Sequence, residues 1–261
     1  MLIDIGVNLT SGRFKKDLGE VVAKAEQQNV TKMMVTGTNV AESQEAVVLT
    51  RQYPGKLYAT AGIHPHHASE CSEQALQSIN HLLQEDSVVA VGECGLDYNR
   101  NYSSPEDQCY CFEEQLKLAV THQLPVFLHQ RDAHADFVSI LSQYIDNIPS
   151  GVAHCFTGSE HEMHAYIDMG LSIGVTGWVC DERRGLELKS VVDQIPRDRI
   201  LIETDAPYLL PRDMRPKPKS NRNEPAYLPH ICQAVADCYS ETFDVVAKQT
   251  TENARRLFRL K

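Results

Sequence analysis

No run of consecutive apolar residues in this sequence approaches the roughly 18 to 20 that a membrane-spanning helix requires. The N-terminus also lacks the basic region and the cleavage site of a secretory signal, because MLIDIGVNLT passes directly into a strand-like run. We therefore expect a protein that has no membrane partner and that remains in the cytoplasm.

The sequence also lacks an excess of positive charge, since 25 Lys and Arg stand against 35 Asp and Glu, a formal net charge of −10. This balance argues against broad, sequence-independent adhesion to nucleic acid, which depends on Lys and Arg neutralising phosphates. One local exception is PRDMRPKPKSNR, residues 211–222, in which basic side chains outnumber the single acid, Asp213. We call residues 211–222 the basic loop. Its composition alone is typical of a solvated, proline-stiffened loop.

The eight cysteines lack the spacing of common zinc or redox motifs, and the one close pair is Cys109-x-Cys111. In a chain of 261 residues without a secretion signal, such cysteines indicate free thiols in a reducing compartment. The cysteines therefore also favour the cytosol.

Short apolar runs recur along the chain, at residues 2–6, 32–37, 57–63, 88–93, 125–129, 151–154, 171–176 and 200–205. They are continuous rather than alternating, which is typical of strands covered by helices on both faces. Helical spacing between and after them predicts helices over residues 18–28, 41–53, 106–120, 134–145, 228–239 and 243–258. This order predicts a (β/α)8 TIM barrel, an α/β fold, with a single domain over residues 1–261. A doubly wound open sheet is the competing topology.

Polar side chains stand where these runs end. The third run leads into His64, and the fourth, fifth, sixth and eighth end at Glu93, His129, His154 and Asp205. In a (β/α)8 barrel these strand ends surround the active site. One histidine there is more often a hydrogen-bonded structural residue, but several imidazoles and carboxylates together are the donors of a Zn²⁺, Mn²⁺ or Mg²⁺ site. A cation would also explain why a buried strand ends in the charge of Glu93, which is costly to desolvate.

Five segments carry a resemblance to a known family: VGECGLDYNR, PVFLHQRDA, AHCFTG, LIETDAPYL and RNEP, in this order. They resemble the TatD family of metal-dependent deoxyribonucleases, and the match covers essentially the whole chain. The resemblance implies an amidohydrolase-like barrel and a 3′-to-5′ exonuclease that requires a divalent metal. Mg²⁺ is the expected metal in function, with Zn²⁺ or Mn²⁺ as alternatives.

The resemblance also implies roles for individual residues. Glu93, His129 and His154 match metal ligands. Asp205 matches the last-strand aspartate, which binds metal or takes the proton from the attacking water, so Glu93 and Asp205 are the candidate catalytic residues. His64, in the GIHPH segment, matches a residue that contacts phosphate.

Two further segments bear on the substrate and on a second metal. The RNEP segment places Arg222 and Glu224 in a loop that the family uses at its site. Most of the family begins with a His-x-His pair, whereas DIGVNLT has Gly6 and Asn8 in those places. Glycine has no side-chain ligand and the Asn8 amide oxygen is a weak one, so a second metal would be held loosely and Asn8 is a candidate substrate contact. A subset of the family shares this start, and the change therefore does not imply inactivity.

Three functions are compatible with these residues. The first is an exonuclease on single-stranded DNA or RNA, acting as a monomer in DNA repair or degradation, with Tyr98, Phe156, Trp178 and Tyr208 as candidate base-stacking residues. The second is a metal-dependent ester or amide hydrolase such as an aminoacyl-tRNA deacylase, because metal-activated water attacks carbonyl carbon and phosphorus alike. The third is a binding module whose site has decayed. The presence of Glu93, His129, His154 and Asp205 argues against this third function.

Overall fold

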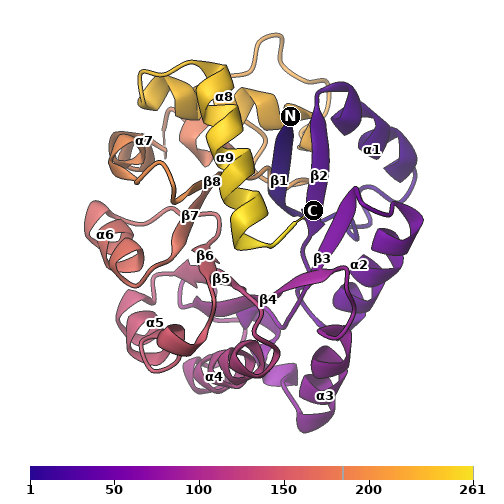
Figure 1. Cartoon of the computed structure of the whole chain (residues 1–261), viewed down its shortest axis with the longest axis vertical. Helices are drawn as coiled ribbons and strands as arrows, with labels where there is room; N and C mark the ends of the chain where they lie inside the picture. Colours follow the sequence, from indigo (N-terminus) through magenta and orange to yellow (C-terminus); the bar gives the residue numbers. More distant parts are fainter. Residues whose placement is uncertain (184, 261) are drawn as a thin grey trace. The chain divides into compact units, whose positions relative to one another are not determined.

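Strands and helices alternate along the chain in the computed structural model, which describes residues 1–183 and 185–260 (Figure 1). The strands are β1 (Leu2–Val7), β2 (Val30–Val35), β3 (Leu57–Ala61), β4 (Val88–Asp97), β5 (Val126–Arg131), β6 (Gly151–Ala153), β7 (Ser172–Val175) and β8 (Ile200–Ile202). The α-helices are α1 (Leu18–Gln27), α2 (Val40–Gln52), α3 (Glu73–Leu82), α4 (Pro105–His122), α5 (His134–Leu141), α6 (Glu160–Asp168), α7 (Leu186–Val191), α8 (Leu228–Cys238) and α9 (Phe243–Leu257). Short 3₁₀ helices are η1 (Pro65–Glu70), η2 (Ile145–Asn147), η3 (Gly177–Cys180), η4 (Val192–Gln194) and η5 (Pro225–Tyr227).

The eight strands are hydrogen-bonded in sequence order, from β1 to β8, and they run parallel. A doubly wound sheet would instead reverse its strand order at a switch point. The order and the alternation with helices therefore make the fold a (β/α)8 barrel, as the sequence predicts. Among the described residues, no helix combines the length and the apolar composition that crossing a bilayer requires.

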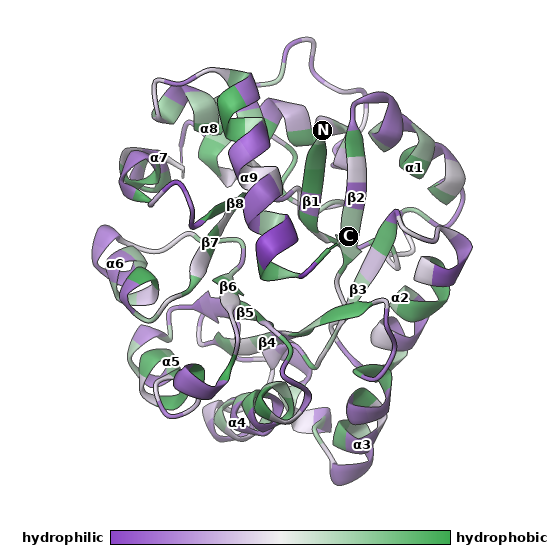
Figure 2. Ribbon diagram, in the orientation of Figure 1, coloured by the Kyte–Doolittle hydropathy of each residue, from purple (hydrophilic) through white to green (hydrophobic). Residues whose placement is uncertain are grey.

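The strands are apolar because helices cover them. Every residue of β1 is buried, and Figure 2 shows this strand as hydrophobic, whereas α9 presents many hydrophilic residues. On α9 the buried positions Val246, Ala247, Thr250, Ala254 and Leu257 recur at three- and four-residue intervals, which is one face of a helix. The same contrast between strand and helix explains why the strand runs could be recognised in the sequence.

Residue contacts divide the chain into two compact units. The first unit comprises Met1–Val35, Cys155–Ile167 and Ser172–Lys261, and the second comprises Thr36–His154 and Asp168–Leu171. Each unit carries part of the predicted functional residues, and each is described by itself below.

In the first unit, the first strand is tied to the segment of the last strand. Val7 pairs in parallel with Ala206, and the Asp4 carboxylate accepts hydrogen bonds from Thr204 N at 2.9 Å and Thr204 Oγ1 at 2.6 Å. Asp4 is fully buried, and burial raises its pKa to about 8. These contacts fix the chain just before Asp205.

In the second unit, two glycines allow β4 to approach β5 closely. Gly92 and Gly95 have φ angles of +138° and +141°, which other residues rarely adopt. A Cβ atom on Gly95 would lie 1.9 Å from the carbonyl oxygen of His129, and one on Gly92 would lie 2.2 Å from that of Phe127. The glycines on either side of Glu93 therefore place this carboxylate beside β5.

The eight predicted strands are confirmed, although several of their bounds differ from those of the apolar runs, and β8 ends at Ile202, three residues before the predicted end of its run. The fourth run was expected to end at Glu93, but β4 continues to Asp97 and is buried throughout. The helix expected over residues 134–145 ends at Leu141, and a separate 3₁₀ turn, η2, follows. The extension of β4 adds a second carboxylate, Asp97, to the same strand.

The close approach of β4 and β5 yields a stability prediction. Gly95→Ala should lower the free energy of unfolding by more than about 2 kcal/mol, because it adds a steric clash to an unfavourable backbone conformation. Gly170→Ala is the matched control, since Gly170 also has a positive φ, +83°, but no atom within 4 Å of the added Cβ; its cost should be about 1 kcal/mol. Urea denaturation measures both, and equal losses would contradict the strand contact as the cause.

Candidate metal centre

Glu93 lies within β4 and is buried, with 6% of its surface exposed. Three imidazole nitrogens lie close to its Oε1 atom: His64 Nε2 at 3.2 Å, His129 Nδ1 at 2.9 Å and His154 Nε2 at 2.8 Å. They come from the residue before η1, from β5 and from the residue after β6. The second unit thus brings together the four candidate residues that its strand ends supply.

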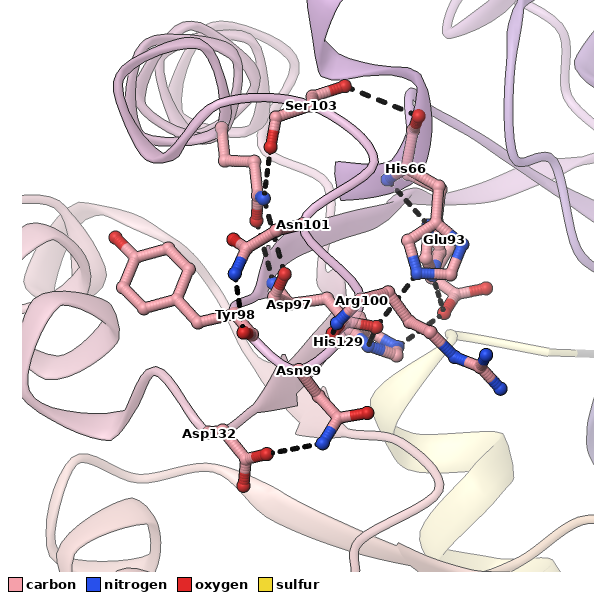
Figure 3. A network of polar contacts seen from close by, with 12 residues as sticks. His66, Glu93, Asp97, Tyr98, Asn99, Arg100, Asn101, Ser103, His129 and Asp132 are labelled. Atoms are coloured by element: carbon pink, nitrogen blue, oxygen red, sulfur yellow. Dashed lines mark hydrogen bonds and ion pairs between the residues drawn. The ribbon is translucent and has the colours of Figure 1, made fainter.

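His129 carries an orphaned ligand atom. Its Nδ1 contacts Glu93, but its buried Nε2 has no hydrogen-bond partner among the described residues, although Asp97 Oδ2 lies 3.4 Å away. Figure 3 shows Glu93, His129, Asp97 and His66 converging. Buried polar atoms are nearly always satisfied by hydrogen bonds, water or an ion. An additional partner is therefore expected at this nitrogen.

The contacts of His64 show which of its two ring nitrogens carries the proton. Its Nδ1 accepts a hydrogen bond from the backbone N–H of His66 at 3.0 Å. In a neutral imidazole the other nitrogen, Nε2, then carries the proton and points it at Glu93. Burial lowers the pKa of His64 to about 4, which keeps the ring neutral at pH 7. His64 is therefore a hydrogen-bond donor in this geometry rather than a metal ligand.

The carboxylates of the cluster stay ionised although they are buried. Burial raises the pKa of Glu93, but the neighbouring imidazoles of His154 and His64 and hydrogen bonds from His129 and His154 outweigh it and hold that pKa well below its usual value. Burial likewise opposes ionisation of Asp97, whose pKa is lowered by the neighbouring imidazoles of His129 and His66. Burial lowers the pKa of His129, and the same two carboxylates reverse the effect and raise it.

These residues fit a divalent cation. Imidazole nitrogen and carboxylate oxygen are the donors that hydrolytic metal sites use, and ligand atoms of His64, Glu93 and His129 lie within 4.8 Å of one another. Of the four residues, Glu93, His129 and His154 are kept as the predicted ligands, because the Nε2 proton of His64 faces Glu93. The role of these residues as metal ligands stays a prediction.

Asp97 and His66 belong to the same cluster and were not singled out from the sequence. His66 Nε2 lies 2.8 Å from Asp97 Oδ2, and the Asp97 backbone is held by the side chain of Gln108, which accepts from its N–H at 2.8 Å. The GECGLD spacing places Asp97 on the same face of the strand as Glu93, because side chains alternate with a period of two. This spacing is the sequence signal from which Asp97 could be predicted as a site residue. A carboxylate that contacts a metal-binding histidine orients its ring.

In the first unit, Asp205 and Asn8 meet. Asn8 Nδ2 donates a hydrogen bond to Asp205 Oδ1 at 2.8 Å, and the Asp205 backbone N–H donates to the Gly6 carbonyl at 2.9 Å. Asp205 adopts a positive φ of 52°, just beyond β8. The two residues that replace the family's His-x-His pair therefore both contact Asp205, one through its side chain and one through its backbone.

Glu203, the other carboxylate of the eighth run, has a backbone partner. It is fully buried, and its Oε1 accepts a hydrogen bond from the backbone N–H of Cys155 at 2.5 Å. This contact positions the chain just after His154.

Arg222 of the RNEP segment is engaged within the protein. Its guanidinium contacts Asp17 through two hydrogen bonds of 2.9 and 2.7 Å and Glu224 through one of 2.7 Å. The pKa of Asp17 is lowered by the hydrogen bonds from Arg222. Only 16% of the Arg222 side chain is exposed. Arg222 and Glu224 therefore lie together, as their predicted common loop requires.

The remaining candidates differ in exposure. Phe156 is buried and packs edge-to-face on Tyr166, so it is a core residue. Tyr98 donates its hydroxyl hydrogen to Asp136 at 2.8 Å. Tyr208 is 52% exposed and Trp178 is partly exposed. In the basic loop, Lys217 and Lys219 are exposed, as are Arg212 and Arg215.

Comparison with known proteins identifies the relatives of this chain. It is 52% identical over 259 residues to a 3′-5′ ssDNA/RNA exonuclease TatD of Pectobacterium carotovorum, covering 99% of this chain and 100% of the relative. A protein with the same name from Erwinia billingiae is 53% identical, with 99% of each chain covered.

Solved structures agree with this relationship. A TatD homologue from Escherichia coli superposes with a TM-score of 0.91 at 28% identity, over 100% of this chain and 98% of the other. A TatD family hydrolase from Entamoeba histolytica gives a TM-score of 0.89, also at 28% identity and with the same coverage. The family model for TatD-related DNases matches residues 3–259, and the chain belongs to this family.

Proposed function

We propose that this protein is a divalent-metal-dependent 3′-5′ exonuclease that hydrolyses phosphodiesters of single-stranded DNA, and of RNA as well. The observation that carries the proposal is the convergence of three imidazoles on Glu93 Oε1, at 2.8 to 3.2 Å, in a chain of the TatD-related DNase family. The substrate class is supported by the relatives named 3′-5′ ssDNA/RNA exonuclease, which share 52 to 53% of their residues with this chain.

Glu93, His129 and His154 are the proposed ligands of the metal, and Mg²⁺ is the proposed metal in function. Such a cation supplies electrostatic stabilisation of the phosphoryl oxygens and lowers the pKa of a water molecule. The contacts of His129 Nδ1 and His154 Nε2 with Glu93 Oε1 support a metal at this cluster, because imidazole nitrogen and carboxylate oxygen are the donors of hydrolytic metal sites. Imidazole donors also favour Zn²⁺ and Mn²⁺, and a reconstitution series compares the three metals.

The protein's own residues perform the remaining steps. Asp205, which follows β8, matches the last-strand aspartate of the family; we assign it as the acceptor of the proton from the attacking water. Asn8 fixes the orientation of Asp205 through Oδ1. We assign to His64 the contact with a phosphate oxygen, for which its Nε2 proton would leave Glu93 when substrate binds, and to Asp97 the positioning of His129.

The basic loop is proposed to bind the phosphates that flank the scissile bond. Its exposed basic residues follow Asp205 directly in the sequence, which supports a position near the site. A single strand can present its end to loops at the end of a barrel, whereas the phosphodiesters of an intact duplex are held in the paired backbone. The proposed preference is accordingly for single strands.

The proposal extends to the cellular setting. All eight cysteines are free thiols, which supports a reducing compartment such as the cytoplasm. We further propose that residues 1–261 act as one domain and as a monomer, in DNA repair or degradation.

The first prediction concerns the metal ligands. His129→Ala and His154→Ala should each lower exonuclease turnover by more than about a hundredfold, since even residues behind the ligands contribute 10- to 100-fold. His164→Ala, on the exposed face of α6, is the matched control and should retain full activity. The assay is digestion of a labelled oligonucleotide by chelated protein restored with Mg²⁺, Mn²⁺ or Zn²⁺. Intact oligonucleotide together with hydrolysis of aminoacyl-tRNA would contradict the proposed function.

The second prediction concerns the basic loop. Replacing Lys217 and Lys219 with Ala should flatten the slope of log affinity against log salt by about 1.4, because each contact with a single-strand phosphate contributes about 0.7. The control pair, Lys189→Ala with Lys248→Ala on α7 and α9, should leave the slope unchanged. An unaltered slope in the loop variant would mean that the loop has no part in binding.

The third prediction separates two roles of Arg222. A double-mutant cycle of Asp17→Asn and Arg222→Ala should give a coupling energy of about 1 to 2 kcal/mol in urea denaturation, because the hydrogen bonds are charge-assisted and partly buried. If Arg222 also contacts substrate, Arg222→Ala should lower single-turnover cleavage, whereas Asp17→Asn, which keeps the guanidinium, should leave it close to wild type. Equal cleavage by wild type and Arg222→Ala would restrict Arg222 to a structural role.

A further inference from the structure

A second group of ligand-type side chains lies in the first unit, away from the residues used above. Cys180 ends η3, Asp213 belongs to the basic loop and His230 lies in the first turn of α8. One ligand atom from each of the three lies within 4.8 Å of the other two. Three separate chain segments therefore bring together side chains of the types that bind metal ions in proteins.

The donor set matches zinc more closely than other common cations. Zn²⁺ binds Cys sulfur at about 2.3 Å, His nitrogen at about 2.0 to 2.1 Å and carboxylate oxygen at about 2.0 to 2.2 Å, in tetrahedral geometry. Tetrahedral ligands at these distances lie about 3.5 Å apart. Ligand atoms up to 4.8 Å apart therefore need to approach by about 1.3 Å at most, whereas His230 Nε2 and Asp213 Oδ1, now 2.7 Å apart, need to separate by about 0.8 Å. The outer two can do so, because 45% of the Asp213 side chain and 34% of the His230 side chain are exposed.

Two of the ligands already contact each other. His230 Nε2 forms a hydrogen bond of 2.7 Å with Asp213 Oδ1, so the imidazole and the carboxylate are already held side by side. Cys180 is only 5% exposed and supplies the buried side of the group. Burial and the neighbouring Asp213 raise the pKa of its thiol, but a thiol that coordinates zinc is deprotonated outright. The raised pKa therefore makes binding pH-dependent without preventing it.

The position of Asp213 indicates what a metal would do here. At its C-terminal end the basic loop is tied through Arg222 to Asp17 and Glu224. Nearer Asp213, Arg212 Nε lies 3.7 Å from Asp181 Oδ2, and the Arg215 guanidinium contacts carbonyl groups of the loop itself, those of Arg212 and Met214. A metal ion bound to Asp213 would link the loop to η3 and α8 at one point. This link would hold in place the segment that carries the exposed basic residues.

We propose that Cys180, Asp213 and His230 bind one Zn²⁺ ion, with a water molecule in the fourth position, and that this ion tethers the basic loop. The site is structural, and it does not depend on the exonuclease activity proposed above. A negative result for this zinc site would not contradict the proposed exonuclease activity, because no ligand of the Glu93 cluster takes part in the zinc site.

Cobalt(II) provides a direct test on the intact protein, because a thiolate ligand gives Co²⁺ a charge-transfer absorption that nitrogen and oxygen ligands do not. Titration of wild type should produce this band at the intensity of one thiolate site, while further Co²⁺ binds at the Glu93 cluster without a thiolate band, and Zn²⁺ should abolish the band. Cys180→Ser, Asp213→Asn and His230→Gln should each weaken or remove the band. His230→Gln is the safest variant, since this side chain is partly exposed and its loss leaves no core cavity.

Two cysteine variants serve as controls. Cys155→Ser removes the thiol next to His154, and Cys238→Ser removes another thiol of the first unit; both should retain the band. Loss of the band in either control, or its persistence in His230→Gln, would overturn the proposed ligand set. The absence of any thiolate band in wild type would overturn the site.

Limited proteolysis tests the tether. Trypsin can cut the basic loop after Arg212 and Lys219, whereas Arg215 and Lys217 precede proline. At a free Zn²⁺ concentration 100 times the dissociation constant, cleavage that requires release of the metal should slow by up to about a hundredfold in wild type. It should not slow in His230→Gln, which keeps the Glu93 cluster. Equal protection of both proteins by Zn²⁺ would contradict the tether.

Discussion

The compensation of one buried negative charge organises the second unit of this protein. An ionised carboxylate that leaves water must find partners that replace its hydration, and Glu93 finds three imidazoles around a single oxygen. Each imidazole belongs to a different strand or turn, so the charge links β4, β5, β6 and η1. One nitrogen of this cluster, His129 Nε2, makes no hydrogen bond among the described residues, and the nearest carboxylate oxygen, Asp97 Oδ2, lies 3.4 Å away.

The backbone makes this arrangement possible at the closest point between two strands. Glu93 stands between Gly92 and Gly95, where no side chain could fit against β5. Behind it, the amide of Gln108 on α4 holds Asp97 from two sides, accepting from its N–H and donating to its carbonyl. The hydrogen bonds around Asp97 in Figure 3 thus form a support that reaches from the helix to the imidazoles. Precise geometry at the cluster is therefore a property of strand packing as much as of the ligands.

Most of the barrel could be predicted from the sequence. Strands that are buried on both faces consist of continuous apolar runs, and these alternate with segments in which apolar residues recur at helical intervals. The cluster could be predicted in part for a related reason: Glu93, His129 and His154 stand where such runs end. Asp97 is not predicted in this way, because β4 continues beyond Glu93, the charged residue at which the sequence predicts the end of the strand. The pairing of Arg222 with Asp17 spans 205 residues, and no local pattern encodes such a contact. The sequence names residue types at strand ends, whereas tertiary packing decides which partner each one meets.

The division of the chain has a consequence for the order in which it is assembled. The second unit is almost contiguous in sequence, whereas the first combines the N-terminal 35 residues with segments made after residue 154. The hydrogen bond from Thr204 to Asp4 closes a loop of 200 residues, and contacts across long separations form late. During synthesis, β1 and β2 therefore precede by more than 100 residues the segments that complete their unit. Apolar strand residues that remain uncovered during this interval favour aggregation.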